Sequence, residues 1–428
     1  MSRNLSVDAG RLAADIDALA EITEPGRPYT RRAFSPLFLE GRAYIDAGMK
    51  AAGLETRIDA GGNLIGLRRG RNSGLGTIVL GSHSDTVPDG GRFDGIAGVI
   101  AALEVARSLD DQGIVLDHDL EVVDFLAEEV SIFGVSCIGS RGMTGQLPDA
   151  WLARSSDGRT LHQAIIDVGG NAGVLARQSR PDIAGFLELH IEQGPILEME
   201  NRDVGIVTAI SGITRVEITI DGRADHAGTT PMGSRADALV AAAQLVLDIR
   251  QAATDLVRGK TAHFTATVGE FRIEPNAANV VPSKAVLLID ARAEERPDMV
   301  TFLQWLDEAA VRIATDYGVT VQPHTVSDNH PTPGHPLLLD VLDRACDTVG
   351  ARHRRMASGA GHDTAWIAKV APAAMIFVPC RGGRSHCADE WAETDDIALG
   401  AAVLMQAAIE MDRLLPEIEE DRNGTHTR

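Results

Sequence analysis

The sequence has few cysteines and no pattern that would make them structural. Its 428 residues contain four cysteines, at positions 137, 346, 380 and 387, and none is part of a C-x-x-C pair. Small secreted domains held by disulfides and zinc ribbons built on cysteine are therefore excluded. We expect reduced thiols that are mostly buried, because free cysteine behaves as a small apolar residue.

Long apolar segments and an excess of basic residues are also absent. The chain carries 40 Lys and Arg against 61 Asp and Glu, a formal charge of −21, which argues against a nucleic-acid partner. No stretch of about 18 apolar residues occurs, so no membrane span is predicted. The N-terminal segment MSRNLSVDAGRLAADIDALA lacks the apolar core and cleavage site of a signal peptide, which predicts a cytoplasmic protein.

Strands and helices alternate through the first half of the sequence. The runs TIVLGSHSD, DLEVVDFLAEE and FLELHIEQG are apolar segments that end in histidine or acidic residues. This alternation is typical of an α/β sheet, in which a site forms at the carboxyl ends of the strands. Chains longer than about 250–300 residues usually contain more than one domain, so we expect two.

A different pattern occupies residues 212–327. TRVEITIDGRA alternates strictly between apolar and polar residues, and it is followed by a long amphipathic helix, two strands, a second helix and a last strand. A compact α+β unit with one open sheet face is predicted here. It interrupts a discontinuous domain of residues 1–211 and 328–428, because SGAGHDTAWIAKV and AAMIFVPC return to the earlier pattern.

The segment GSHSDTVPDGGRFDG is the strongest local indication of chemistry. His83 and Asp85 stand two residues apart at a strand end, and Asp94 follows in a glycine-rich loop. Histidine and carboxylates are ligands for zinc, manganese and cobalt. A ligating histidine usually donates its other ring N–H to a carboxylate, which Asp85 could supply. Asp94, just before a helix, could bridge two cations.

Further candidate ligands follow the later strands. Glu128 and Glu129 are neighbours whose side chains diverge on an extended segment, so one can bind metal while the other acts as a base. His190 lies in ELHIEQG and His386 in SHCADE. Each residue alone is more often structural or solvated. The prediction of a metal site rests on a repeated pattern, in which an apolar strand is followed by a residue that can bind metal.

The ordered motifs resemble those of a known family. GSHSDTV, GGRFDGIAGV, AEE, ELHIEQGPILE, DHAGTTPM, PNAANVVP and SGAGHD are similar to motifs of the hydantoinase/carbamoylase family in the M20 di-metal peptidase-like group. That family includes N-carbamoyl-L-amino acid hydrolases, β-ureidopropionases and allantoate amidohydrolases. The resemblance implies a mixed-sheet di-metal exopeptidase-like catalytic domain, and it implies that the inserted unit is a lid that also forms a homodimer.

The resemblance also implies roles for matching residues. Two divalent ions (zinc, manganese, cobalt or nickel) would share Asp94, one with His83 and His190, the other with Glu129 and His386. Glu128 would be the general base and later the proton donor, and Asp85 would orient His83. The remaining implied residues contact the substrate: Gln193, Asn279, Arg292, Gly359, Ala360, and His226, which would stabilise the oxyanion in the partner's active site. From the residues alone, a rim ion pair with Asp290 is the favoured interpretation of Arg292, and Asn279 could simply cap a turn.

The implied reaction is hydrolysis of a linear amide or ureido C–N bond in a small molecule that carries a carboxylate. N-carbamoyl-L-amino acids would give the amino acid, carbon dioxide and ammonia. Alternatives are an allantoate or ureidoglycolate amidohydrolase, an N-acyl amino acid deacylase, and, from another class, a non-catalytic metal-binding scaffold. One departure concerns Val130–Ile132, where the family often has glycine and arginine after the glutamate pair. We therefore expect the substrate to differ in size or polarity from the substrates of the best-known family members.

Overall fold

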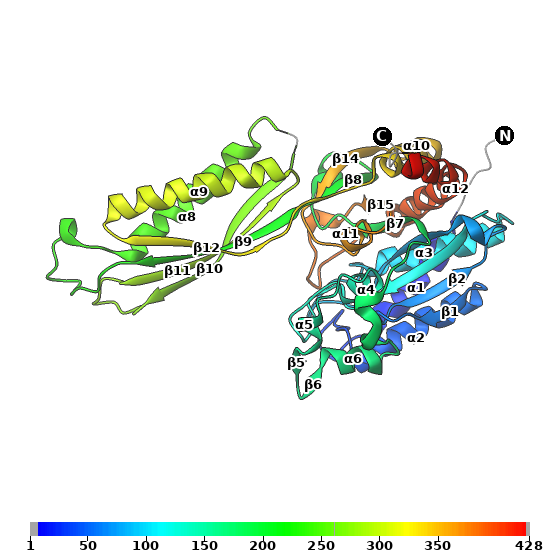
Figure 1. Ribbon diagram of the computed structural model, residues 1–428, viewed down its shortest axis with the longest axis horizontal. Helices are drawn as coiled ribbons and strands as arrows, with labels where there is room; N and C mark the ends of the chain where they lie inside the picture. The colour runs from blue at the N-terminus through cyan, green and yellow to red at the C-terminus, as the bar shows by residue number, and fades with distance from the viewer. Residues whose placement is uncertain (1–6, 261, 425–428) are drawn as a thin grey trace. The chain divides into compact units, whose positions relative to one another are not determined.

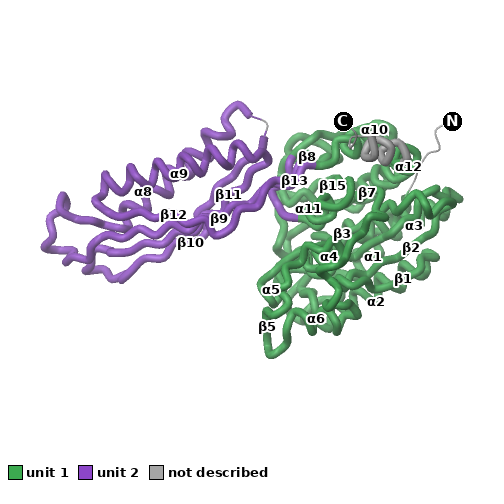
Figure 2. Tube along the Cα trace, in the orientation of Figure 1, with its two compact units in different colours: residues 1–208, 334–356, 362–428 green, residues 209–333, 357–361 purple. Residues whose placement is uncertain are grey.

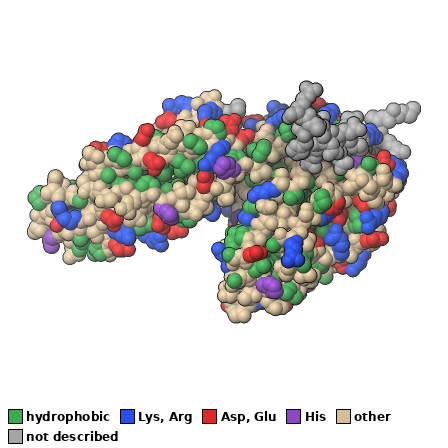
Figure 3. All heavy atoms as spheres, in the orientation of Figure 1, with side chains coloured by type: hydrophobic (Ala, Val, Ile, Leu, Met, Phe, Trp, Pro, Cys, Tyr) green, Lys and Arg blue, Asp and Glu red, His purple; other side chains and the backbone are tan. Residues whose placement is uncertain are grey.

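The computed structural model describes residues 7–260 and 262–424, and these divide into two compact units. The first unit contains residues 1–208, 334–356 and 362–428, and the second contains residues 209–333 and 357–361 (Figure 2). In the described part of the chain, no helix is long and apolar enough to cross a membrane. Acidic and basic side chains are interspersed on the face shown in Figure 3, which gives no broad basic surface there.

A mixed sheet forms the centre of the first unit. In spatial order its strands are β1 (Glu55–Ile58), β2 (Leu64–Arg68), β4 (Asp119–Phe125), β3 (Thr77–His83), β7 (Ile183–Ile191), β15 (Ala373–Val378) and β8 (Val204–Ile210), with β14 (His353–Ser358) also paired to β8. Strands β4, β3, β7 and β15 are parallel, whereas β1, β2 and β8 pair antiparallel with their neighbours. The predicted α/β class with a mixed sheet is confirmed.

Helices bury both faces of this sheet (Figure 1). On one face, Ile78 and Leu80 of β3 join an apolar cluster with α1 (Ala9–Glu21), α3 (Ile96–Asp111), α10 (Pro336–Val349) and α12 (Thr394–Gly424). Val79, between them, packs on the opposite face with Phe186 and Ile367. Burial on both faces explains why the central strands are continuous apolar runs in the sequence.

One further long helix and several short elements complete the first unit. They are α2 (Pro36–Ala51), α4 (Ile138–Met143), α5 (Asp149–Leu152), α6 (Leu161–Asp167), α7 (Ile196–Met199), α11 (Thr364–Ile367) and the hairpin of β5 (Ser155–Ser156) and β6 (Arg159–Thr160). Because the central strands are parallel, their carboxyl ends meet at one edge of the sheet. The segments that carry the candidate ligands begin at this edge.

The second unit is an antiparallel sheet covered on one face by two helices. Its strands lie in the order β10 (Phe264–Glu274), β11 (Lys284–Ala293), β9 (Gly212–Asp221) and β12 (Thr320–Asp328), and its helices are α8 (Ala238–Val257) and α9 (Arg296–Tyr317). Val216, Ile218 and Ile220 of β9 are buried against the helices, while the alternate residues Glu217 and Thr219 are half-exposed. The strict alternation in the sequence thus corresponds to one buried and one open face.

The second unit extends beyond residues 212–327 at both ends. Ile210 and Ala209, at the end of β8, pair with β13 (Thr332–Pro333). Residues 357–361, which the sequence pattern placed with the catalytic domain, also belong to this unit. They pack there because Ser211 N donates to Ser358 O at 2.9 Å and Arg292 Nη1 donates to Gly359 O at 2.7 Å.

Candidate metal centre

The candidate ligands all lie in the first unit, at the carboxyl edge of the parallel strands. His83 is the last residue of β3, His190 lies near the end of β7, and Glu129 follows β4 by four residues. Asp94 precedes α3, and His386 lies in the loop after β15 with φ 54°. Four separate chain segments therefore bring these side chains together, in addition to the segment of Asp94.

The two oxygens of Asp94 face different groups of ligands. Its Oδ1 lies 3.1 Å from His190 Nε2 and 3.9 Å from His83 Nε2. Its Oδ2 lies 2.9 Å from His386 Nε2, which is also 3.0 Å from Glu129 Oε1. Within each of these two triplets, one ligand atom per residue lies within 4.8 Å of the others. Each oxygen of Asp94 therefore faces a separate triplet of potential ligand atoms.

Backbone carbonyls orient the two buried imidazoles. His83 Nδ1 lies 3.1 Å from Asp85 O, and His190 Nδ1 lies 2.9 Å from Ile191 O. A proton on Nδ1 satisfies each carbonyl and leaves Nε2, which faces Asp94, with a lone pair for a metal. Fixed tautomers and converging carboxylates fit borderline divalent ions such as zinc.

Asp85 differs from its predicted role in one respect. Its backbone carbonyl is nearer to His83 Nδ1 than its carboxylate, whose Oδ1 is 3.6 Å away. The same Oδ1 accepts a hydrogen bond from Glu128 N at 3.1 Å. The turn after β3 directs the carboxylate toward the segment after β4, so Asp85 holds the Glu128 backbone in place as well as lying beside His83.

Glu128 and Glu129 point to different partners. Glu128 Oε2 lies 3.8 Å from His83 Nε2, and its other oxygen lies 3.5 Å from Cys137 Sγ. Glu129 instead reaches His386. Glu128 is therefore near the ligands without belonging to either triplet, which leaves its carboxylate available for proton transfer.

The electrostatics show an excess of buried negative charge. Hydrogen bonds to Asp94 and Glu129 raise the pKa of His386 to about 11. Burial raises the pKa of Glu128 well above its usual range, and repulsion by Glu129 adds to this while His83 opposes it. Burial raises the pKa of Glu129 as well. Such a group binds protons or cations strongly, because buried carboxylates need a compensating charge.

Glu390 supports the metal group and was not identified from the sequence. Its side chain is buried, with Oε1 accepting hydrogen bonds from Phe93 N at 2.7 Å and Asp94 N at 3.0 Å. Oε2 accepts a hydrogen bond from Ser385 Oγ at 2.6 Å. Glu390 thus joins the loop of Asp94 to the loop of His386. The only sequence indication was its position four residues after His386.

Glycines allow the close approach of these loops. A Cβ on Gly91 would overlap the carboxylate of Glu390, and a Cβ on Gly95 would overlap the ring of His83. Gly95 also has φ 67°, a conformation that favours glycine. Gly91 and Gly95 are therefore required by contacts with Glu390 and His83.

The predicted substrate contacts are divided between the units. Gln193 belongs to the first unit, and its Nε2 lies 3.2 Å from both Asp94 Oδ2 and Ser385 Oγ, so the structure brings it to the metal group. The other predicted contacts belong to the second unit. They are His226, Asn279, Arg292, Gly359 and Ala360.

Within the second unit these residues form two groups. Asn279 O accepts a hydrogen bond from Ala227 N at 3.0 Å, so the loops of Asn279 and His226 are adjacent. Arg292 Nε donates to Asp290 Oδ1 at 2.7 Å, which is the rim ion pair considered above. Its Nη1 donates to Gly359 O at 2.7 Å.

Val130 and Ile132, in the first unit, expose 61% and 36% of their surface.

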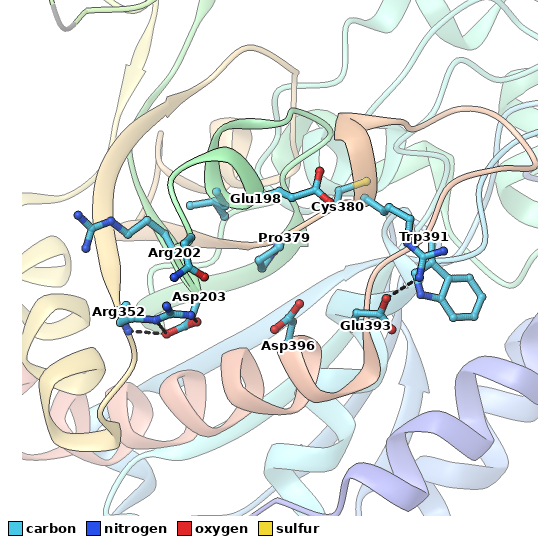
Figure 4. A pocket seen from close by; sticks show the side chains of 12 residues that line it. Glu198, Arg202, Asp203, Arg352, Pro379, Cys380, Trp391, Glu393 and Asp396 are labelled. Carbon is cyan, nitrogen blue, oxygen red and sulfur yellow. Dashed lines mark hydrogen bonds and ion pairs between the residues drawn. The ribbon is translucent and has the colours of Figure 1, made fainter.

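A separate pocket of about 210 Å³ lies beside the segment that leads from β15 to His386 (Figure 4). Its walls include Arg202, Pro379 and Asp396, and several of its charges are paired, Arg352 with Asp203 and Arg381 with Glu393. None of the five candidate ligands lines it. It is therefore distinct from the metal group.

Comparison with known proteins identifies the family. The profile of peptidase family M20/M25/M40 matches residues 79–410. An N-carbamoyl-L-amino-acid amidohydrolase of Paenarthrobacter aurescens is 36% identical over 409 residues, covering 95% of this chain and 98% of that protein. A ureidoglycolate hydrolase of Oryza sativa subsp. japonica is 34% identical over 420 residues, covering 95% of this chain and 85% of the relative.

Solved structures agree with these sequence relatives. A hydantoinase/carbamoylase family amidase from Burkholderia multivorans has a TM-score of 0.89 and 36% identity, covering 96% of this chain and 99% of that chain. The resemblance inferred from the motifs is thereby confirmed. With a profile match that spans most of its length and relatives that it covers almost completely, this chain belongs to peptidase family M20/M25/M40.

Proposed function

We propose that this protein is a metal-dependent amidohydrolase that converts N-carbamoyl-L-amino acids to L-amino acids, carbon dioxide and ammonia. One observation carries the proposal: Asp94 joins two ligand triplets, and a buried Glu128 lies beside them outside both triplets. The names of relatives that match this chain over nearly their whole length support the substrate class. Allantoate and ureidoglycolate are the alternatives, because relatives of similar identity carry those names.

Two divalent ions per chain are part of the proposal. His83, Asp94 and His190 would hold one, and Asp94, Glu129 and His386 the other. Bound there, such ions polarise a carbonyl group and lower the pKa of water. Zinc, manganese, cobalt and nickel all suit imidazole and carboxylate ligands.

Glu128 would carry the proton during the reaction. It takes a proton from the attacking water as oxygen bonds to the ureido carbon, and it delivers that proton to the leaving nitrogen as the C–N bond breaks. The carbamate that remains then loses carbon dioxide. Burial raises the pKa of Glu128. A carboxylate with a raised pKa is a stronger base, which helps it to accept the proton of the water and hold it until the nitrogen leaves.

Substrate recognition would use both units. Arg292, whose Nε and Nη1 are engaged by Asp290 and Gly359, would bind the substrate carboxylate through its remaining nitrogen. Gln193, beside Asp94, would contact the ureido group. We include in the proposal a homodimer formed through the second unit, in which the partner's copy of His226 would stabilise the oxyanion. Asn279, Gly359 and Ala360 would also contact the substrate.

The test is ammonia release from a panel of substrates by protein reconstituted with manganese, zinc or cobalt. N-carbamoyl-L-amino acids should exceed allantoate, ureidoglycolate and N-acetyl amino acids in kcat/KM. Within the panel, apolar side chains should be preferred, because Val130 and Ile132 present exposed apolar surface next to Glu129. Activity that survives complete removal of metal would contradict the mechanism. Stoichiometric metal without turnover of any of these compounds would favour a scaffold protein.

A further inference from the structure

Cations and indole rings alternate along a column of side chains in the first unit. The column consists of Arg154, Trp151, Arg141, Trp366 and Lys369. Arg141 Cζ lies 3.4 Å from the centre of the Trp366 ring and 4.6 Å from that of Trp151. Lys369 Nζ lies 4.0 Å from the Trp366 ring, and Arg154 Cζ 5.6 Å from the Trp151 ring. These side chains come from α4, α5, α11 and the residues after α5 and α11 (Figure 1).

The cations of this column have no acidic partners. Among the residues that the structure describes, neither Arg141, Arg154 nor Lys369 forms an ion pair with a carboxylate. Several other arginines of the first unit are paired, for example Arg42 with Asp124 and Arg180 with Glu121. Burial and repulsion from Arg141 lower the pKa of Lys369, so these positive charges act on each other without neutralisation. Such a local positive field is unusual in a chain with a formal charge of −21.

The central guanidinium is prepared for a ligand in its own plane. Stacking against Trp366 and Trp151 fixes the Arg141 side chain, and its buried Nε has no hydrogen-bond partner in the described structure. A buried donor without a partner costs about 1–3 kcal/mol, which a bound acceptor would recover. The fork of N–H groups matches the spacing of two oxygens of a carboxylate or phosphate.

The flanking cations extend the same field. Arg154 is exposed and uses Nη1 only for the carbonyls of Phe133 and Gly134, at 3.3 and 3.4 Å. Lys369 is exposed at the opposite end of the column. Both present basic side chains that a ligand can approach from solvent.

We propose that this column is a binding site for an oxyanion, a phosphate or carboxylate group of a small molecule, with Arg141 as its central ligand. The site includes none of the residues proposed for metal binding or hydrolysis. It therefore goes beyond the proposed function and stands whether or not that function is correct.

The test is titration of the metal-loaded full-length protein with inorganic phosphate and, separately, with malonate, at low ionic strength. Tryptophan fluorescence is one readout, since Trp151 and Trp366 are two of the four tryptophans, and calorimetry is the other. Phosphate can also bind metals, so each titration compares wild type with Arg141→Gln. Arg71→Gln is the matched control, because it removes an exposed arginine that pairs with Asp117.

We expect Arg71→Gln to bind like wild type and Arg141→Gln to bind about 10- to 100-fold more weakly, as for a lost charged hydrogen bond. Lys369→Gln, an exposed change that preserves the fold, should weaken binding several-fold and covers the case in which Arg141→Gln fails to fold. Response to phosphate alone would define a phosphate site, and response to both anions a general oxyanion site. No titration in wild type, or equal binding by a folded Arg141→Gln, would overturn the proposal.

Discussion

Replacement of Glu390 tests how the metal group is held in place. Glu390→Leu removes the acceptor for Phe93 N and Asp94 N and the partner of the Ser385 hydroxyl. Each buried donor left unpaired costs about 1–3 kcal/mol, so the two N–H groups predict a loss of roughly 2–6 kcal/mol. Part of this loss lowers the affinity for metal, because the loop that carries Asp94 is no longer held in place before the ion binds.

If half of the loss falls on the metal-bound state, about 1–3 kcal/mol, the metal dissociation constant rises roughly 5- to 150-fold. Glu390→Gln should behave differently. Its amide oxygen still accepts from both N–H groups, and its amide N–H can donate to the Ser385 oxygen. We therefore expect metal affinity within about 10-fold of wild type, the deficit reflecting one negative charge removed from beside Asp94.

The assay is competition for metal against a chelator of known affinity, with urea unfolding of the same samples. Glu393→Leu and Glu393→Gln are the matched controls, because Glu393 is nearby, exposed and paired with Arg381. Both controls should keep wild-type affinity. The reasoning is wrong if Glu390→Leu keeps that affinity, or if Glu390→Gln is as damaged as Glu390→Leu.

Three further predictions concern the same centre. Glu128→Gln should lower kcat by about 10²–10⁴-fold with metal content unchanged, measured by ammonia release and elemental analysis; near-normal turnover would exclude Glu128 as the base. In metal-free protein, the pKa of His386 is raised to about 11, so its stabilising contribution is complete below its unfolded pKa and is lost as pH rises toward 11. Thermal unfolding of chelated wild type should show this loss, and His386→Gln should not. Gly95→Ala should abolish tight metal binding, because its Cβ would overlap the His83 ring at a φ of 67°; unchanged metal affinity would contradict the requirement for glycine.

The sequence was informative where a side chain follows a buried parallel strand. His83, His190 and the Glu128–Glu129 pair each stand at or just after the end of such a strand. Parallel strands place their carboxyl ends at one edge, so apolar runs alone predict that these residues converge. The alternation in β9 likewise predicted its buried face, because a strand with one open face has period two.

Contacts between irregular loops were not predictable in this way. Glu390 contacts Phe93 and Asp94, which lie 297 and 296 residues earlier in the sequence, through loops whose course no local pattern specifies. Asp85 was expected to orient His83, but the turn after β3 places its backbone carbonyl closer to the ring than its carboxylate. A sequence motif predicts which residues lie near each other. The backbone conformation of the turn then determines which atom of a residue makes the contact.

The surroundings of Arg141 could not be predicted from the sequence for a similar physical reason. Helices α4 and α11 have six and four residues, too short for a periodic signal, and the tryptophans on either side of Arg141 come from segments about 200 residues apart. Only the folded chain shows that the Arg141 guanidinium lies close to both indole rings and, among the described residues, has no carboxylate partner.

The buried carboxylates of the metal group affect the stability of the folded chain. Asp94, Glu128 and Glu129 converge on three imidazoles. The neighbouring carboxylates raise the pKa values of these imidazoles, and burial raises those of both glutamates. In the unfolded chain these carboxylates are solvated and separate, so folding without a cation must bring them together against repulsion or take up protons. Divalent ions remove that cost in the folded state alone. Metal binding should therefore raise stability by an amount that grows with pH above neutrality, as protons cease to substitute for the ions.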